Sequence, residues 1–142
     1  MRILITVTAA LALTASIGYC QEPPAKIKKV QATYTNPGSG PEMFISYCAP
    51  CHGGDGKGQG PAASALKKAP SDLTMLSAKH GGKFPVLEVQ HYIRGESLTD
   101  AHGSRDMPIW GDLFRSLGSN QDSIVTLRVK NLSDYIAGIQ HK

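Results

Sequence analysis

The sequence has few of the features that would give a chain of 142 residues a self-sufficient core. Only 6% of its residues are aromatic, with a single tryptophan. No stretch has the alternating apolar pattern of a β-strand, and there are no internal repeats or long runs of heptads. We therefore expect one all-α domain of about 3–5 short helices, with something apolar and bulky completing its core.

Cysteine is scarce, with only Cys20, Cys48 and Cys51 in the chain. No cysteine follows Cys51, so the second pair that a zinc site of this spacing needs is missing. The pattern ahead of Cys48 is helical, whereas a thioredoxin-like dithiol lies between a strand and a helix. Both absences disfavour a zinc site and a redox dithiol.

The chain also lacks a strong charge imbalance. It has 15 basic and 11 acidic residues, and removal of Arg2 with a cleaved leader would leave 14 − 11 = +3 with the histidines neutral. This surplus is far smaller than that of a typical nucleic-acid-binding surface. We therefore predict no nucleic-acid partner.

One apolar run is present, at the N-terminus. Arg2 is followed by an uncharged apolar stretch up to Gly18, which is the layout of a secretory signal peptide, and the run is short for a membrane span. We predict a signal peptide over residues 1–20, cut after Gly18 or near Cys20. A lipid-modified Cys20, as in bacterial lipoproteins, is the alternative, although Tyr19 stands where such proteins have a small residue.

Residues 21–39 are rich in proline, glycine and polar side chains, which is the composition of a flexible linker. We therefore place the folded domain at 40–142. Ser39 and Pro41 predict the start of a helix that runs into Cys48. A second helix is predicted over 87–94, with Leu87, His91 or Tyr92, and Arg94 on one face and Gly95 as its end.

The clearest helical pattern lies near the C-terminus. Apolar residues recur there at spacings of four and three, which predicts a long amphipathic helix; they are Val125, Val129, Leu132, Ile136 and Ile139. Two loops precede it, at 53–60 and 96–108.

The loop Gly53–Gly60 has five glycines in eight residues. No Gly-Lys-Ser/Thr follows, so it resembles a phosphate-binding loop only superficially. Glycine permits close approach of a backbone to a bulky neighbour, and we expect the loop to serve that purpose.

The sequence Cys48-Ala-Pro-Cys51-His52 has the spacing of a c-type haem attachment site. Two thiols one helical turn apart can add to the two vinyl groups of one porphyrin edge. The adjacent histidine can then reach the iron. This pattern predicts one covalently bound haem c, with Cys48, Cys51 and His52 as its attachment residues.

The surrounding residues extend the pattern. Gly40-Pro-Glu-Met-Phe44 lies ahead of the cysteines, Gly53 and the run up to Pro61 follow, and Met107-Pro108 and Leu132-Ser-Asp-Tyr-Ile136 come later. Over about 40–140 the chain resembles the single-haem class I cytochromes c. That resemblance implies the cytochrome c fold, in which the first helix packs across the last. Here Gly40, Phe44 and Tyr47 would meet Leu132, Tyr135 and Ile136.

The resemblance also implies a methionine as the second axial ligand of the iron. Met107 is our candidate, because it lies in a loop and Pro108 restrains it. Met75 is an alternative, and His102 would give bis-histidine ligation and a lower potential. Other implied contacts are the Pro61 carbonyl, as acceptor for the second ring nitrogen of His52, and Arg94, Arg105 and Trp110, as partners of the haem propionates. For Arg94, Arg105 and Trp110 the alternative is an ordinary surface charge or core aromatic.

By this resemblance the protein is expected to be an exported one-electron carrier and not an enzyme. Histidine and thioether would fill both axial positions of the iron. The expected location is periplasmic or otherwise extracytoplasmic, with transient redox proteins as partners. One alternative is a haem subunit, or a domain tethered through Cys20, of a larger respiratory or oxidoreductase complex. Another is a peroxidase or sensor whose Met107 bond opens.

Overall fold

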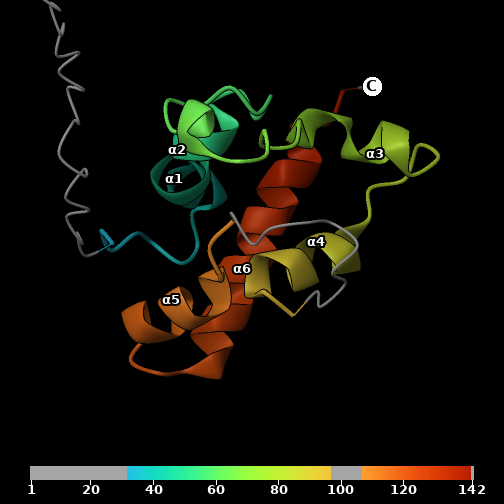
Figure 1. The fold of residues 1–142 in the computed structure, drawn as a ribbon. Helices are drawn as coiled ribbons and strands as arrows, with labels where there is room; N and C mark the ends of the chain where they lie inside the picture. Colours follow the sequence, from blue (N-terminus) through green and yellow to red (C-terminus); the bar gives the residue numbers. More distant parts are fainter. Residues whose placement is uncertain (1–31, 97–106, 142) are drawn as a thin grey trace, which may run out of the picture. The chain divides into compact units, whose positions relative to one another are not determined.

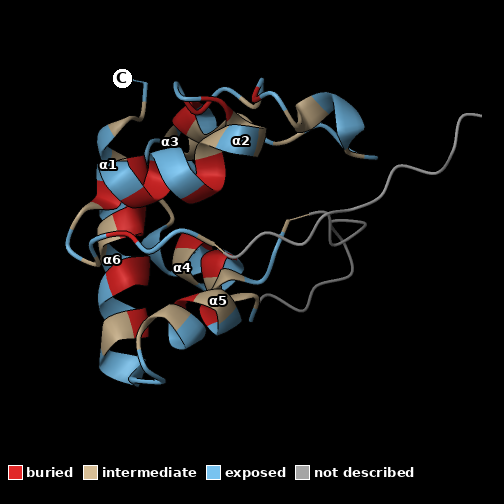
Figure 2. Cartoon of the chain, turned by 90° about the vertical axis from the view of Figure 1, so that its left-hand side faces the viewer, coloured by how far each residue is buried: buried red, intermediate tan, exposed pale blue. Residues whose placement is uncertain are grey.

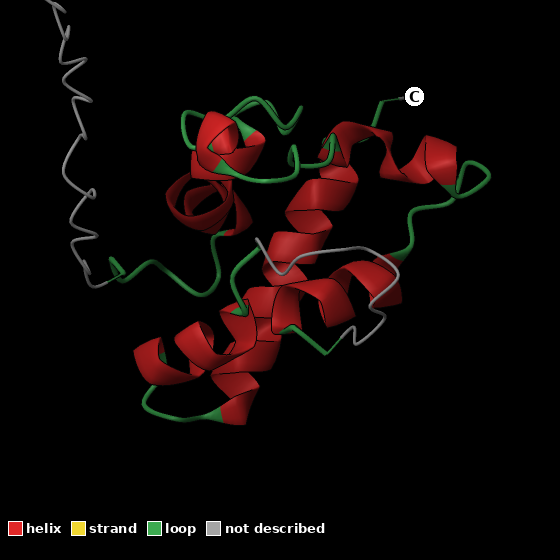
Figure 3. Cartoon of the chain, viewed as in Figure 1, coloured by secondary structure: helices red, strands yellow, loops and turns green. Residues whose placement is uncertain are grey.

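The computed structural model describes residues 32–96 and 107–141. The chain divides into two units, residues 1–30 and 31–142, and all described residues belong to the second. Within the described ranges every regular element is helical and none is a strand (Figure 3). The prediction of an all-α domain is therefore confirmed. The predicted signal peptide and Cys20 lie outside the described residues.

The three predicted helices occur in the order predicted, and α3 and α5 are additions (Figure 1). Residues 40–52 form an unbroken helical stretch. Counted with that stretch as a single helix, the described residues contain five α-helices. The elements are α1 (Gly40–Met43), the π-helical segment η1 (Phe44–Cys48), α2 (Ala49–His52), the 3₁₀ turns η2 (Ala63–Ala65) and η3 (Leu73–Met75), α3 (Leu76–Lys79), α4 (Val86–Arg94), α5 (Trp110–Leu117) and α6 (Asp122–Gly138).

The stretch 40–52 starts as predicted. The Ser39 hydroxyl accepts a hydrogen bond from the Glu42 N–H at 3.3 Å, and Pro41 occupies the first turn. Its middle is wider than an α-helix, because the Ala49 N–H donates to the Phe44 carbonyl five residues back. Pro50 has no N–H and cannot make the next α-helical bond, which favours this widened turn at Phe44–Cys48.

Helix α6 runs through the domain, and α1, α4 and α5 pack on it (Figure 1). Its predicted apolar face is confirmed, since Val125, Val129, Leu132 and Ile136 are all at most 3% exposed. Figure 2 shows buried faces on α1 and α6 where the two helices meet.

Gly40 permits the α1–α6 contact. A Cβ at Gly40 would lie 2.4 Å from the Asn131 carbonyl oxygen and 2.8 Å from the Tyr135 Cβ. The ring of Phe44 packs on Tyr135 with centroids 5.0 Å apart. The predicted packing of the first helix across the last is therefore confirmed. Tyr47, however, contacts the aromatic rings of α5.

Three predictions about helices and boundaries are corrected. In α4 the face with Val89 and Ile93 is buried, whereas Leu87 is 72% exposed. The predicted face was wrong because only Val89 and Ile93, four residues apart, are directed into the core shared with α6. Gly95 ends the helix as predicted, with φ at +80°. Helix α5 was not predicted at all.

The third correction concerns the boundary between linker and domain. Residues 32–39 belong to the compact unit, not to a flexible arm. Thr35 is 2% exposed, and the Asn131 side-chain amide donates to the Pro37 carbonyl at 2.9 Å. Composition alone could not reveal this, because the docking partners of the segment lie on α6, more than ninety residues away.

Candidate cofactor site

A cleft opens between the stretch 40–52, the segment after the glycine loop, α4 and the start of α5. The cavity within it has a volume of about 100 Å³, and the cleft is widely open to solvent. The residues that line it are Tyr47, Cys48, Cys51, His52, Leu66, Lys68, Ala69, Pro70, Ser71, Tyr92, Met107, Pro108 and Trp110. The cleft thus brings together five predicted site residues, namely Cys48, Cys51, His52, Met107 and Trp110.

The two cysteines lie at the end of the helical stretch as free thiols. Cys48 is only 6% exposed, and its burial, with a smaller contribution from Cys51, raises its pKa to about 12. The Cys48 thiol is therefore protonated at neutral pH. A redox dithiol needs a lowered thiol pKa, so this environment disfavours a redox dithiol.

His52 is the last residue of α2, and a hydrogen bond fixes its ring. Nδ1 lies 2.9 Å from the Ser71 carbonyl oxygen. Since a carbonyl only accepts, Nδ1 carries the proton in this bond and Nε2 keeps its lone pair for a ligand. Desolvation by burial lowers the pKa of His52, while the bond to Ser71 raises it less. The imidazole is thus held neutral in the tautomer that a metal needs.

The predicted Pro61 partner of His52 is wrong, because Ser71 accepts this bond. The glycine loop lies instead against the last turn of the helix. The Gly58 N–H donates to the His52 carbonyl at 2.7 Å, the Gly60 N–H to the Cys51 carbonyl at 3.0 Å and the Ala62 N–H to the Pro50 carbonyl at 2.8 Å. The loop therefore satisfies carbonyls at the end of α2, and its backbone passes beside Pro50, away from the ring.

Close approach explains two of the glycines. A Cβ at Gly60 would lie 2.4 Å from the Pro50 carbonyl oxygen, and one at Gly58 would lie 2.3 Å from the Pro70 carbonyl oxygen. Gly58 also has φ at +85°, a conformation that glycine adopts without strain. Close approach was predicted correctly, but the neighbour is the chain's own backbone.

Ser71 is held in place by the chain around it. Asp72 accepts from the Thr74 N–H at 2.9 Å and so caps η3. The Gln140 side chain donates to the Leu73 carbonyl at 2.6 Å and accepts from the Ser77 N–H at 2.8 Å. The end of α6 thus supports the carbonyl that orients His52. No local sequence signal pointed to Ser71, because this pairing spans nineteen positions.

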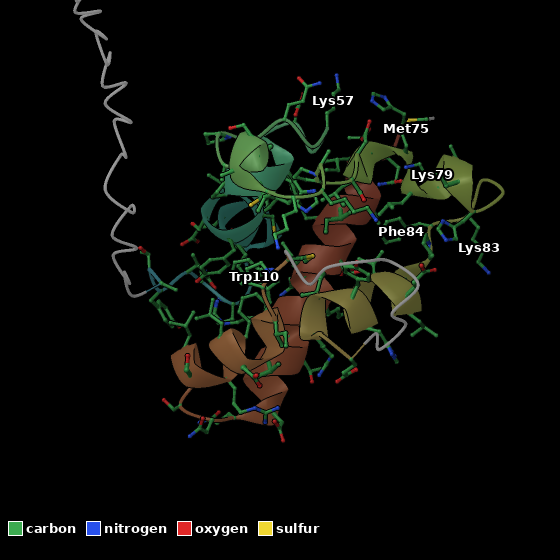
Figure 4. The ribbon with its side chains drawn as sticks, viewed as in Figure 1. Lys57, Met75, Lys79, Lys83, Phe84 and Trp110 are labelled. Atoms are coloured by element: carbon green, nitrogen blue, oxygen red, sulfur yellow. The ribbon has the colours of Figure 1, made fainter. Side chains whose placement is uncertain are left out.

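The structure separates the two candidate methionines. Met107 lines the cleft with His52, directly before α5. Met75 is 37% exposed and does not line the cleft. Figure 4 shows Met75 near α3, well apart from Trp110. Of these two, only Met107 shares the cleft with the histidine. His102 and Arg105 lie outside the described residues.

Aromatic residues form one wall of the cleft. Trp110, half-buried at the start of α5, lies 5.5 Å from Tyr47 and 6.1 Å from Phe114 between ring centroids (Figure 4). Trp110 is thus both a cleft residue and part of an aromatic cluster. Tyr92 of α4 also lines the cleft and was not predicted to do so.

Arg94 does not line the cleft. Its guanidinium donates to the Thr126 hydroxyl of α6 at 3.1 Å. The structure therefore does not support Arg94 as a cofactor contact, and it joins α4 to α6 instead. In the part of the chain that is described, no three His, Cys, Asp or Glu side chains gather as metal ligands.

In comparisons with known proteins, no family model, no curated protein and no solved structure matched the chain.

Proposed function

We propose that this chain is an exported cytochrome c domain that binds one haem covalently through Cys48 and Cys51 and carries single electrons. The observation that supports the proposal is the content of the cleft. The cleft is lined by the Cys48 and Cys51 thiols, the oriented imidazole of His52 and the thioether of Met107. The Cys48 thiol is protonated at neutral pH. This donor set, gathered on one open cleft, fits a haem.

Cys48 and Cys51 attach the group. The two S–H groups would hold a haem by addition across its two vinyl groups, with sulfur and hydrogen both ending on the former double bond. The neutral Cys48 thiol already holds the proton that this addition requires. Two thioether bonds from consecutive helical turns fix the register of the group in the cleft.

His52 and Met107 would hold the iron of a bound haem in this proposal. The Ser71 carbonyl holds the Nδ1–H of His52, which keeps Nε2 available. Pro108 restricts the backbone conformations of Met107, which limits how far the thioether can move away from the cleft. Trp110 and Tyr47 line the cleft with their aromatic rings. A bound haem with both axial positions filled supplies one-electron oxidation and reduction.

The proposed place of work is the periplasm or another extracytoplasmic space, where redox proteins would dock transiently. It rests on the predicted leader and on the covalent attachment. Among the described residues no helix is long and apolar enough to cross a membrane. The alternative of a haem subunit or a lipid-tethered domain of a larger complex is tested by fractionation. Retention in the membrane, or co-migration with a large complex, would favour that alternative over a free carrier.

Absorption spectra test the proposal directly. The full chain is exported in a host that attaches c-type haem, and wild type, Met107→Ala and Met75→Ala are compared in both redox states. We expect a covalent low-spin haem with a weak long-wavelength iron–sulfur band that only Met107→Ala removes. Met75→Ala is the matched control, since Met75 lies outside the cleft.

Three outcomes contradict the assignment. If Met107→Ala keeps the band, another methionine holds the iron, and the loss of the band in Met75→Ala would identify Met75. If the wild type lacks the band, the ligand is not a thioether, and His102→Ala tests whether it is His102. If the wild type binds carbon monoxide or turns over peroxide without denaturant, the iron has an open position. The carrier function is then replaced by the sensor or peroxidase function.

A further inference from the structure

Arg128, on the central helix α6, is the largest fully buried side chain of the described residues and is 0% exposed. A buried guanidinium is normally paired with a carboxylate, because it keeps its charge at all physiological pH values. The ion pairs among the described residues do not include Arg128. Within the described ranges, its charge is thus balanced by neutral groups alone.

The neutral partners are polar and aromatic. Nη1 donates to the Thr35 hydroxyl at 2.9 Å and Nη2 to the Thr35 carbonyl at 2.8 Å. The guanidinium carbon lies 5.0 Å from the ring centroid of Tyr34 and 5.8 Å from that of Phe114. Nε has no partner among the protein atoms. A lone buried charge is costly for stability, and stability alone gives no reason for it.

A chain of hydrogen bonds leads from Arg128 to the cleft. The Tyr47 hydroxyl donates to the Thr33 carbonyl at 2.6 Å. The Tyr47 oxygen must therefore accept in its 2.9 Å bond with Thr35, whose hydroxyl in turn accepts from Arg128. Every hydrogen bond in this chain has a fixed direction. Tyr47, at its end, is part of the cleft wall.

A second connection runs through aromatic rings. Phe114, which lies against the guanidinium, is 5.6 Å from Tyr47 and 6.1 Å from Trp110 between centroids. Tyr47 and Trp110 both line the cleft. Aromatic rings thus connect the buried charge to the cleft wall, and because Arg128 is 0% exposed, solvent screens its charge poorly.

We propose that Arg128 is a positioning residue for the redox centre, which holds Tyr47 in the cleft wall through Thr35 and raises the reduction potential by its unpaired buried charge. The inference rests on the proposed haem function. A nearby positive charge disfavours the oxidised centre, which carries one more positive charge than the reduced one. The effect is strong only where both charges are shielded from water.

The test is redox titration of the exported holoprotein in wild type, Arg128→Met, Arg128→Lys and Thr35→Asp. Lys130→Met is the matched control, because Lys130 is an exposed cation on the same helix, paired with Asp134. At a fixed solution potential we expect Arg128→Met to lower the ratio of reduced to oxidised protein roughly three- to tenfold, where tenfold corresponds to 59 mV for one electron. Lys130→Met should change it less than twofold. Arg128→Lys should retain most of the ratio.

Thr35→Asp provides a test that keeps the arginine. A carboxylate at 35 would pair with Arg128 and cancel its charge, so the reduction potential should fall as in Arg128→Met. This variant therefore tests the inference even if Arg128→Met does not accumulate as holoprotein. High salt should leave both shifts in place, since a buried charge is little screened. Urea unfolding is measured alongside.

The outcomes separate the two proposals. If Arg128→Met and Thr35→Asp lower the free energy of unfolding but leave the potential unchanged, Arg128 is only structural and the inference is overturned. An equal shift in Lys130→Met overturns it as well, because burial would then have no role. If the wild type attaches no haem, the proposed function itself is wrong and this inference falls with it.

Discussion

The α1–α6 crossing and the cleft are built in different ways. The crossing is a contact between two helices whose apolar side chains are almost fully buried, and Gly40 lets the backbones approach. The cleft is assembled from four parts of the chain and held by single hydrogen bonds, such as the one between His52 and Ser71. The crossing follows from the spacing of apolar side chains along each helix, whereas the cleft depends on hydrogen bonds between residues that are far apart in the sequence.

The largest expected effect is on the cleft. Replacing both Cys48 and Cys51 by alanine removes the thiols that would form thioether bonds, so covalent haem should be lost entirely. Haem staining after denaturing electrophoresis measures this. The wild type is the positive control, and Met75→Ala should stain like it. Retention of covalent haem by the double variant would show that the attachment site lies elsewhere.

Core truncation should affect the crossing next most strongly. Leu132 is 0% exposed, so Leu132→Ala should lower the free energy of unfolding by about 2–5 kcal/mol through lost burial and a cavity. Leu87→Ala is the matched control, because Leu87 is 72% exposed, and it should cost less than about 0.5 kcal/mol. Urea denaturation gives both values. Similar costs for the two variants would place Leu87 in the core after all.

A substitution at Gly40 tests the backbone contact itself. Gly40→Ala would place a Cβ 2.4 Å from the Asn131 carbonyl oxygen and should lower the free energy of unfolding by about 1–3 kcal/mol. Gly54→Ala is the control, since nothing lies within 4 Å of a Cβ there. The same urea experiment measures both. A stable Gly40→Ala protein would mean that α1 and α6 do not approach so closely.

The smallest expected effect concerns the segment that carries Ser71. Hydrogen bonds from Thr74 lower the pKa of the exposed Asp72 carboxyl, with smaller contributions from nearby positive charges. A lowered pKa in the folded state stabilises the fold above the ordinary value near 3.8, and this stabilisation is lost as the pH falls through the lowered pKa. Asp72→Asn should therefore flatten the acid side of the curve of unfolding free energy against pH. An unchanged curve would mean that the carboxylate contributes nothing to the segment.

Sequence reasoning succeeded where the signal is local. Ser39, Pro41 and Gly95 mark helix ends through their own backbone and side-chain chemistry, and the structure confirms them. The spacing of Val125, Val129, Leu132 and Ile136 predicted the buried face of α6. The same reasoning failed for Leu87, because several apolar residues in α4 compete and only packing decides between them.

The pairings of the candidate site were predicted only in part. Met107 was chosen over Met75 on its loop position and its following proline, and the structure places it in the cleft. The acceptor for His52 was assigned to Pro61, but the glycine loop turns its backbone toward the end of α2 and leaves Ser71 facing the ring. Such assignments depend on where two loops lie in space, and residue types carry little information about that.

The sequence by itself determined the helical class, the cysteine–histidine spacing at 48–52 and the amphipathic face of α6, because each depends on residues within one or two helical turns. Only the tertiary structure decided that residues 32–39 belong to the domain, that Ser71 orients His52 and that Arg128 is buried with no carboxylate partner in the described part of the chain. Those features join positions that are tens of residues apart. Their energies come from burial and from single hydrogen bonds that exist only once α6 has packed against the rest of the chain.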